Sequence, residues 1–150
     1  MALASIFGSC DSTADQRAGP EEPAFVAPAG LIAAKDRIFF GAFNPATGYE
    51  LWTSRGQQAQ QIKDIRPAFR GSYPAFLTAF NGRVFFAADD GVNGTELWSI
   101  DGTSTGAAFF KDIHTGSGAS LPNALTVVGV HLYFVADDGR HGDELWRTGG

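Results

Sequence analysis

Two loops of this chain gather enough oxygen-bearing side chains to hold a metal ion. Asp89 and Asp90 are followed by Asn93, and Asp137 and Asp138 occupy the same place 48 residues later. Calcium takes six to eight oxygen ligands, so these five residues are candidate calcium ligands, although their spacing does not fit the EF-hand consensus. The alternative is that the aspartates accept hydrogen bonds from nearby backbone N–H groups and stabilise the turns.

Three further carboxylates, Glu50, Glu96 and Glu144, each precede a Leu-Trp pair. Two carboxylates that face each other across a sugar can hydrolyse a glycosidic bond as acid and base. These three are related by a repeat, so we expect them to lie one unit apart and not to converge. A structural role is favoured, in which each glutamate bonds to the backbone of a neighbouring strand.

The remaining nucleophiles and bases form no recognisable catalytic motif. His114, His131 and His141 have no serine or cysteine placed beside them by a known signature, and one cysteine, Cys10, with three histidines does not give a zinc-site spacing. Catalytic triads are assembled from distant residues, so the sequence alone does not exclude one. We expect a protein that is not an enzyme, with no catalytic residues and no cofactor other than calcium.

The chain is organised as a repeat, which becomes visible when it is aligned with itself. Glu-Leu-Trp occurs at residues 50–52, 96–98 and 144–146, at spacings of 46 and 48 residues. The same shifts align the Phe-Phe pair 39–40 with 85–86, and the segment Ala-Asp-Asp-Gly 88–91 with 136–139. We therefore divide residues 24–150 into three units, 24–72, 73–120 and 121–150, of which the last is truncated.

Each unit predicts four antiparallel strands. In the second unit the apolar run 77–80 is followed by Asn81-Gly82, which favours a two-residue hairpin turn, and then by strands at 83–88, 95–100 and 107–113. The 19 glycines and 13 phenylalanines of the chain fit many short strands joined by tight turns. This indicates an all-β fold of propeller-type blades, with each tryptophan filling the space between adjacent sheets.

The segment Glu-Leu-Trp-Ser-Ile-Asp-Gly-Thr, residues 96–103, resembles the defining motif of the bacterial ELWxxDGT-repeat proteins. The Ala-Asp-Asp-Gly and Lys-Asp-Ile segments that flank it are also similar to that family, and the resemblance covers roughly residues 24–150. It implies β-propeller-like repeats in exported bacterial proteins of largely uncharacterised function, and no enzymatic activity. The first unit departs from the motif, because Glu50-Leu51-Trp52 is not followed by an Asp-Gly turn.

From this resemblance we expect a non-catalytic binding or scaffold module at the bacterial cell envelope or outside the cell. Its ligand would be a protein or a glycan, bound at the rim loops or on the top face of the ring. Two alternatives stay open. One is an enzyme domain that acts on extracellular polysaccharide at the ring centre, and the other is a structural repeat stabilised by calcium.

Charge and hydropathy exclude two classes of partner. The net charge is −5 and no cluster of Lys and Arg is present, so the chain lacks the basic patch that binding to nucleic acid requires. No apolar run approaches the ~20 residues that span a bilayer. We expect neither a nucleic-acid partner nor a membrane span.

Residues 1–23 carry a different signal. A short apolar stretch of small residues ends at Cys10, which resembles the end of a bacterial lipoprotein signal, although it has no basic region before it. In that interpretation Cys10 is lipidated and anchors the protein. The alternative is that residues 1–23 form a flexible acidic tether to the repeats.

Three units are too few for a closed propeller, which uses about four to eight blades. We expect either that the sequence is a fragment of a longer protein or that copies associate to complete the ring. The third unit ends before a fourth strand, and we hypothesise that residues 24–26 supply that strand.

Overall fold

The computed structural model describes residues 29–103 and 106–149, and this part of the chain forms three antiparallel β-sheets with no helix. The first sheet contains β1 (Ala29–Ala34), β2 (Arg37–Asn44), β3 (Gly48–Arg55) and β4 (Gln58–Gln61). The second contains β5 (Ala75–Phe80), β6 (Arg83–Asp89), β7 (Thr95–Ile100) and β8 (Ala108–Lys111). The third contains β9 (Asn123–Val128), β10 (His131–Asp137) and β11 (Asp143–Thr148).

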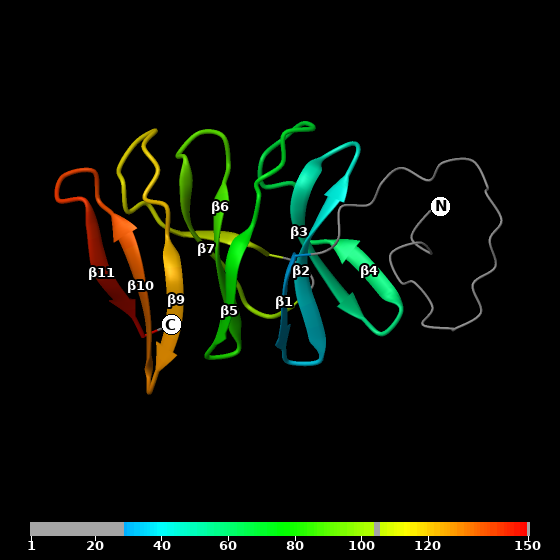
Figure 1. Cartoon of the computed structure of the whole chain (residues 1–150). Coiled ribbons are helices and arrows are strands. Elements are labelled where there is room, and N and C mark those ends of the chain that lie inside the picture. The colour runs from blue at the N-terminus through cyan, green and yellow to red at the C-terminus, as the bar shows by residue number, and fades with distance from the viewer. Residues whose placement is uncertain (1–28, 104–105, 150) are drawn as a thin grey trace, which may run out of the picture.

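Within each sheet the strands are neighbours in the order of the sequence, so every unit is a simple meander. The three sheets stand side by side, and the β2–β3, β6–β7 and β10–β11 loops lie at the same end of all three (Figure 1). The first strands lie next to each other, because β5 contacts both β1 and β9. Each sheet falls within one of the three predicted repeat units.

The local turn chemistry agrees with the sequence. Asn81 and Gly82, which join β5 to β6, both have positive φ angles, of 50° and 71°. Two successive positive φ angles are what a type I′ turn needs, and its twist matches that of the flanking strands. The predicted hairpin at this place is therefore confirmed.

The core lies between the sheets, and strand alternation decides which cluster each side chain joins. Trp98 and Phe86 face the first sheet and pack in one cluster with Phe39 and Leu51. Leu97, one residue away from Trp98, faces the third sheet and packs with Leu132 and Phe134. The expectation that the tryptophans fill the space between adjacent sheets is confirmed for Trp98, which packs between the first and second sheets. It is not met by Trp52, which packs with Phe40, Ala42 and Ala59 of its own sheet.

The all-β prediction is confirmed for the described residues, and the third sheet has three strands, where the first two have four. The described residues do not form a closed ring. Cys10, the rest of residues 1–23 and the proposed closing strand 24–26 lie outside the described part of the chain. In residues 29–103 and 106–149 there is also no helix with the length and hydropathy to cross a membrane.

Candidate functional site

The first feature that the structure adds is a hydrogen-bond node centred on each buried glutamate. Glu50 is fully buried near the start of β3. Its carboxylate accepts hydrogen bonds from the backbone N–H groups of Ile65 and Arg66, both at 3.3 Å, and from the hydroxyl of Ser72 at 2.6 Å. These donors all lie in the connection between β4 and β5, so Glu50 fixes the segment that leads into the next sheet.

Glu96 repeats this arrangement in the second sheet and is also fully buried. It accepts hydrogen bonds from the N–H groups of Ile113 at 3.0 Å, His114 at 3.3 Å and Ser120 at 3.0 Å. The Ser120 hydroxyl donates a further bond at 2.6 Å. A buried carboxylate is stable only when its oxygens are well satisfied, and here four donors replace the lost water.

The serine of each node also binds the following sheet. The Ser72 carbonyl accepts a hydrogen bond of 2.9 Å from the N–H of Asp89, and the Ser120 carbonyl accepts the equivalent bond of 2.9 Å from Asp137. Each glutamate is thereby connected, through one serine, to the second strand of the next unit. The expected structural role of Glu50 and Glu96 agrees with this geometry, and the three glutamates lie in three separate sheets.

Glu144, the third member of the set, is exposed near the start of β11. The described part of the third unit ends before a Lys-Asp-Ile segment or a node serine, so the donors that surround Glu50 and Glu96 have no counterpart there. The identical tripeptide therefore stands in two different environments.

The aspartate loops use their oxygens within the loops. Asp90 Oδ1 accepts the N–H groups of Val92 and Asn93, both at 2.8 Å, and Asp90 Oδ2 accepts the Asn93 side-chain amide at 2.7 Å. Asp89 Oδ1 accepts the N–H of Gly91, and Asp89 Oδ2 pairs with the Arg66 guanidinium. Partial burial of Asp90 opposes its ionisation, but the hydrogen bonds from Asn93 and Val92 outweigh this effect and lower the pKa of Asp90. The geometry is that of a side chain stabilising its own turn.

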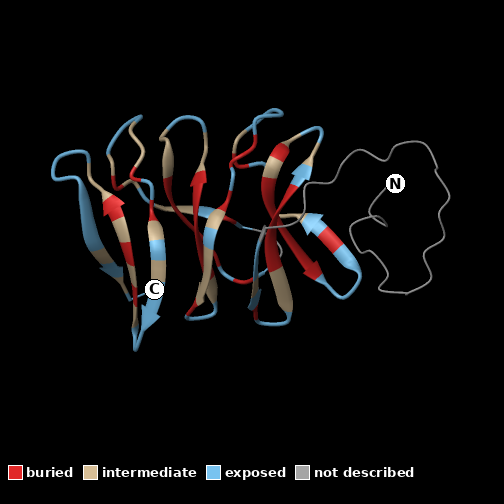
Figure 2. Ribbon diagram, viewed as in Figure 1, coloured by how far each residue is buried: buried red, intermediate tan, exposed pale blue. Residues whose placement is uncertain are grey.

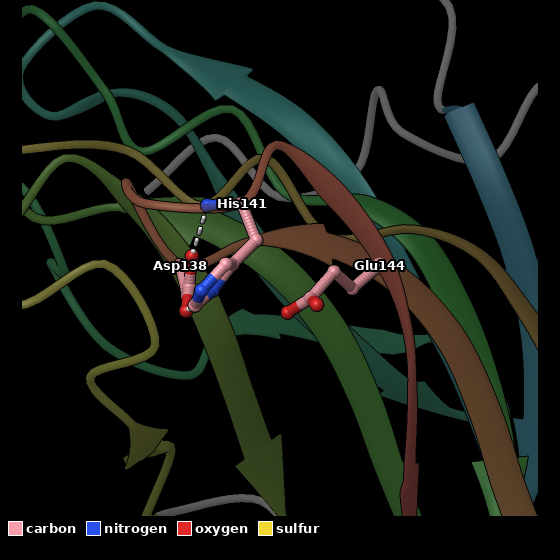
Figure 3. A group of neighbouring side chains, drawn as sticks. All are labelled: Asp138, His141 and Glu144. Atoms are coloured by element: carbon pink, nitrogen blue, oxygen red, sulfur yellow. Dashed lines mark hydrogen bonds and ion pairs between the residues drawn. The ribbon is translucent and has the colours of Figure 1, made fainter.

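The loop of the third unit repeats this pattern, and it also brings together Asp138, His141 and Glu144 (Figure 3). Asp137 Oδ1 accepts the N–H of Gly139, and Asp138 Oδ1 accepts the N–H groups of Arg140 and His141. One ligand atom from each of Asp138, His141 and Glu144 lies within 4.8 Å of the others, which is compact enough for a metal ion.

The repeat explains this group without an ion. His141 stands where the second unit has Asn93, and its Nδ1 lies 2.9 Å from Asp138 Oδ2, as the Asn93 amide lies near Asp90. The hydrogen bond from His141 holds the pKa of Asp138 down to about 2 and raises the pKa of His141 above its ordinary value. A protonated His141 donates to Asp138 and repels a cation. The geometry therefore favours the turn-stabilising alternative, and calcium binding by these loops has still to be tested.

The other two histidines have structural surroundings. His114 is equivalent to Arg66, and its ring lies against Gly118 and against Gly139 of the next unit, where a side chain on either glycine would collide with it. The ring of His131 is tilted against Tyr133, with centroids 6.0 Å apart. No interaction of these rings with a serine hydroxyl is found among the described residues.

An aromatic pair, which the sequence analysis did not single out, lies between the first and second sheets. The rings of Tyr49 and Tyr73 are stacked, with centroids 6.0 Å apart and an angle of 16° between their planes. Tyr49 Oη donates to the carbonyl of Gly41 at 3.1 Å, and the N–H of Tyr73 donates to the carbonyl of Tyr49 at 3.1 Å. These two hydrogen bonds fix the position of the pair. Tyr73 nevertheless has 65% of its surface exposed, so one ring of the pair is open to solvent.

This pair is specific to one boundary of the repeat. A Cβ atom at position 41 would lie 2.6 Å from Tyr49 Cε1, so the Tyr49 ring can take this position only when residue 41 is glycine. The equivalent of Gly41 is Ala87 in the second unit, and Tyr49 and Tyr73 are replaced by Thr95 and Leu121 at the next boundary. The loop residue Phe69, 72% exposed, is replaced by Ser117. These coordinated departures from the repeat are the signal that a sequence comparison of the units could have found.

Comparison of the chain with protein-family models, curated proteins and solved structures gives no match. The similarity to ELWxxDGT repeats therefore stays a prediction that depends on residues 96–103 and their flanks.

The glutamate node gives a prediction with an internal control. Replacing Glu96 by Ala leaves several buried N–H and O–H donors without an acceptor, so we expect the free energy of unfolding to fall by about 3 kcal/mol or more. Glu144→Ala removes the equivalent but exposed side chain and should change it by less than about 0.5 kcal/mol. Urea unfolding followed by tryptophan fluorescence measures both, and equal effects of the two substitutions would contradict the role given to the node.

The node of Glu50 predicts a pH dependence. Burial raises the pKa of Glu50 above its ordinary value of 4.5, against the opposing effects of Ser72 and the N–H groups of Arg66 and Ile65. The folded protein therefore holds this proton more tightly than the unfolded chain, and the contribution of Glu50 to stability falls as pH rises from 4.5 through the raised pKa. We expect the unfolding free energy of wild type minus that of Glu50→Gln to decrease as pH rises over that range, and to level off above it. A difference that is constant with pH would show that the pKa of Glu50 is not raised.

For the aspartate loops we expect no calcium effect, because both carboxylate oxygens of Asp90 and of Asp138 already accept hydrogen bonds. The melting temperature should be the same in millimolar calcium and in chelator. A rise with calcium that is absent in Asp138→Asn would instead establish the calcium-stabilised repeat.

Proposed function

We propose that this chain is a non-catalytic binding module built of β-propeller-type blades, exported to the bacterial cell envelope, and that its ligand is a saccharide. The observation that carries the proposal is the stacked and exposed pair Tyr49–Tyr73 at the loop end of the first two sheets. Export and attachment through Cys10 rest on the family resemblance and on the sequence before the repeats.

The propeller interpretation is supported by the arrangement of the sheets. Consecutive meanders stand side by side, their first strands contact each other, and large apolar side chains fill the space between neighbours. Blades around an axis have these three properties. Completing a ring would take additional blades, from the remainder of a longer chain or from other copies.

The non-catalytic interpretation is supported by how the acidic residues are used. Glu50 and Glu96 are fully buried, and their oxygens are occupied by backbone and serine donors. Neither carboxylate is accessible to a substrate. An enzyme that acts on polysaccharide would need other residues than these.

A saccharide fits the chemistry of the aromatic pair. The face of an aromatic ring is electron-rich and attracts the slightly positive C–H groups on one face of a pyranose, while a tyrosine hydroxyl can bond to sugar hydroxyls. Tyr73 presents such a face without losing side-chain freedom on binding, because Tyr49 and the backbone bond between the two residues already fix it. Phe69 adds a second exposed ring in the loop just before Tyr73.

The test is binding of the full chain to a panel of soluble bacterial and plant polysaccharides, measured by affinity electrophoresis and then by calorimetry. Tyr73→Ala should weaken binding about tenfold, since ring stacking of this kind contributes up to about 1.5 kcal/mol. Leu121→Ala is the matched control, because Leu121 occupies the same place at the next boundary and is exposed to a similar degree.

If Tyr73→Ala and Leu121→Ala weaken binding equally, the ligand does not bind at the tyrosine pair. Binding to none of the polysaccharides would contradict the saccharide proposal and leave a protein ligand as the function to test.

A further inference from the structure

The connection between β4 and β5 carries an arginine beside the aromatic residues of the proposed saccharide site. Phe69 and Arg70 are neighbours at the exposed tip of this connection, and Tyr73 follows three residues after Arg70. In Figure 2 the tip is exposed, at the same end of the sheets as the β2–β3 and β6–β7 loops. The site therefore combines aromatic rings with a positive charge.

The tip is held in one conformation by its own residues and by the first sheet. Pro67 has a restricted φ angle, and Ala68 has a φ of 76°, which a non-glycine residue keeps only when its surroundings enforce it. Gly71 has a φ of 72°, and a Cβ atom on it would lie 2.3 Å from the backbone nitrogen of Tyr49. The residue after Arg70 thus packs directly on the strand that bears Tyr49, which fixes where the arginine leaves the backbone.

The guanidinium of Arg70 has no carboxylate partner within the described part of the chain. Arg66, four residues earlier, pairs with Asp89. Asp90 uses both of its carboxylate oxygens within its own turn. The acidic side chains at the start of the neighbouring β6–β7 loop are therefore already occupied, and Arg70 is available to an anion from outside the chain.

The next boundary of the repeat has neither the rings nor the cation. The residues of the β8–β9 connection that correspond to Pro67, Ala68, Phe69, Arg70 and Tyr73 are Thr115, Gly116, Ser117, Gly118 and Leu121. Both connections nevertheless make the same hydrogen bonds to the buried glutamate of their own sheet. The stacking of the sheets therefore does not require the aromatic residues and the arginine at the first boundary.

We propose that the saccharide bound at the tyrosine pair is acidic, a polysaccharide with uronic acid residues whose carboxylates pair with Arg70. This inference rests on the proposed function, because it specifies the ligand of the same site. A guanidinium presents its N–H donors in a planar fork that matches the two oxygens of a carboxylate. A uronic acid joins that carboxylate to a pyranose ring, whose C–H face can stack on Tyr73 or Phe69.

The acidic character of the whole chain opposes such a ligand only weakly. The net charge is −5, but charges more than about 8 Å from the ligand are largely screened at physiological ionic strength. The local contact with Arg70 therefore decides the preference for a charged sugar.

The test compares the acid and the ester of one polymer with the full chain, by calorimetry in the presence of chelator. Sodium polygalacturonate carries carboxylates, and its methyl ester has the same rings and linkages without the charges. Sodium alginate and its propylene glycol ester provide the same comparison with other uronic acids. We expect one of the two acids to bind about three- to fivefold more tightly than its ester, which is the effect of one exposed ion pair. Arg70→Gln should bind the acid only as tightly as the ester, and should bind the ester as the wild type does.

Arg140→Gln is the matched control, because Arg140 is also an exposed arginine in a loop at that end of the sheets, between β10 and β11. It should keep the wild-type preference for the acid. The inference is wrong if wild type binds acid and ester equally, if Arg70→Gln keeps the preference, or if Arg140→Gln also loses it. Binding of neutral polysaccharides alone, weakened by Tyr73→Ala, would overturn this inference and leave the proposed function standing. Absence of binding to every polysaccharide would overturn both.

Discussion

The stacking of the sheets depends on one interaction, the hydrogen bonding of a buried glutamate to the connection that follows its own sheet. The carboxylates of Glu50 and Glu96 have no cationic side-chain partner among the described residues, and their burial is compensated by backbone N–H groups and a serine hydroxyl. Removing a carboxylate from water is unfavourable unless such donors are in place. The node therefore forms only when the connection adopts one particular path.

That path determines where the next sheet stands. Ser72 donates its hydroxyl to Glu50 and accepts the N–H of Asp89, so the position of β6 follows from the position of β3. Around this common node the two boundaries differ in detail. At the first, Arg66 pairs with Asp89, and at the second, His114 lies against Gly139. The repeat keeps the node and varies the contacts beside it, which leaves the loop end free to carry a feature such as the tyrosine pair.

Much of the fold could be predicted from the sequence because the same pattern of strands and turns occurs in all three units. The all-β class, the Asn81-Gly82 hairpin and the opposite faces of Leu97 and Trp98 follow from turn chemistry and strand alternation, which act over a few residues. The hydrogen-bond partners of the glutamates could not be predicted in this way. Ser120 is 24 residues from Glu96, and the path of the connection that carries Ser120 depends on the whole fold. The tyrosine pair joins positions in two units and needs Gly41, so it is invisible when the units are compared only for what they share.

The node also makes the coupling between units directional. Each glutamate is satisfied by residues that follow it in the chain, and the serine among them already belongs to the boundary with the next unit. In a linear array, where stability is a sum of unit and interface terms, the same Glu-Leu-Trp is then worth different amounts according to what comes after it. Leu145 shows the consequence, because the identical tripeptide, with neither that connection nor a following sheet among the described residues, exposes a leucine that is buried in both preceding units. A unit of this repeat is thus completed from its C-terminal side, and the motif by itself does not fix whether its own side chains are buried.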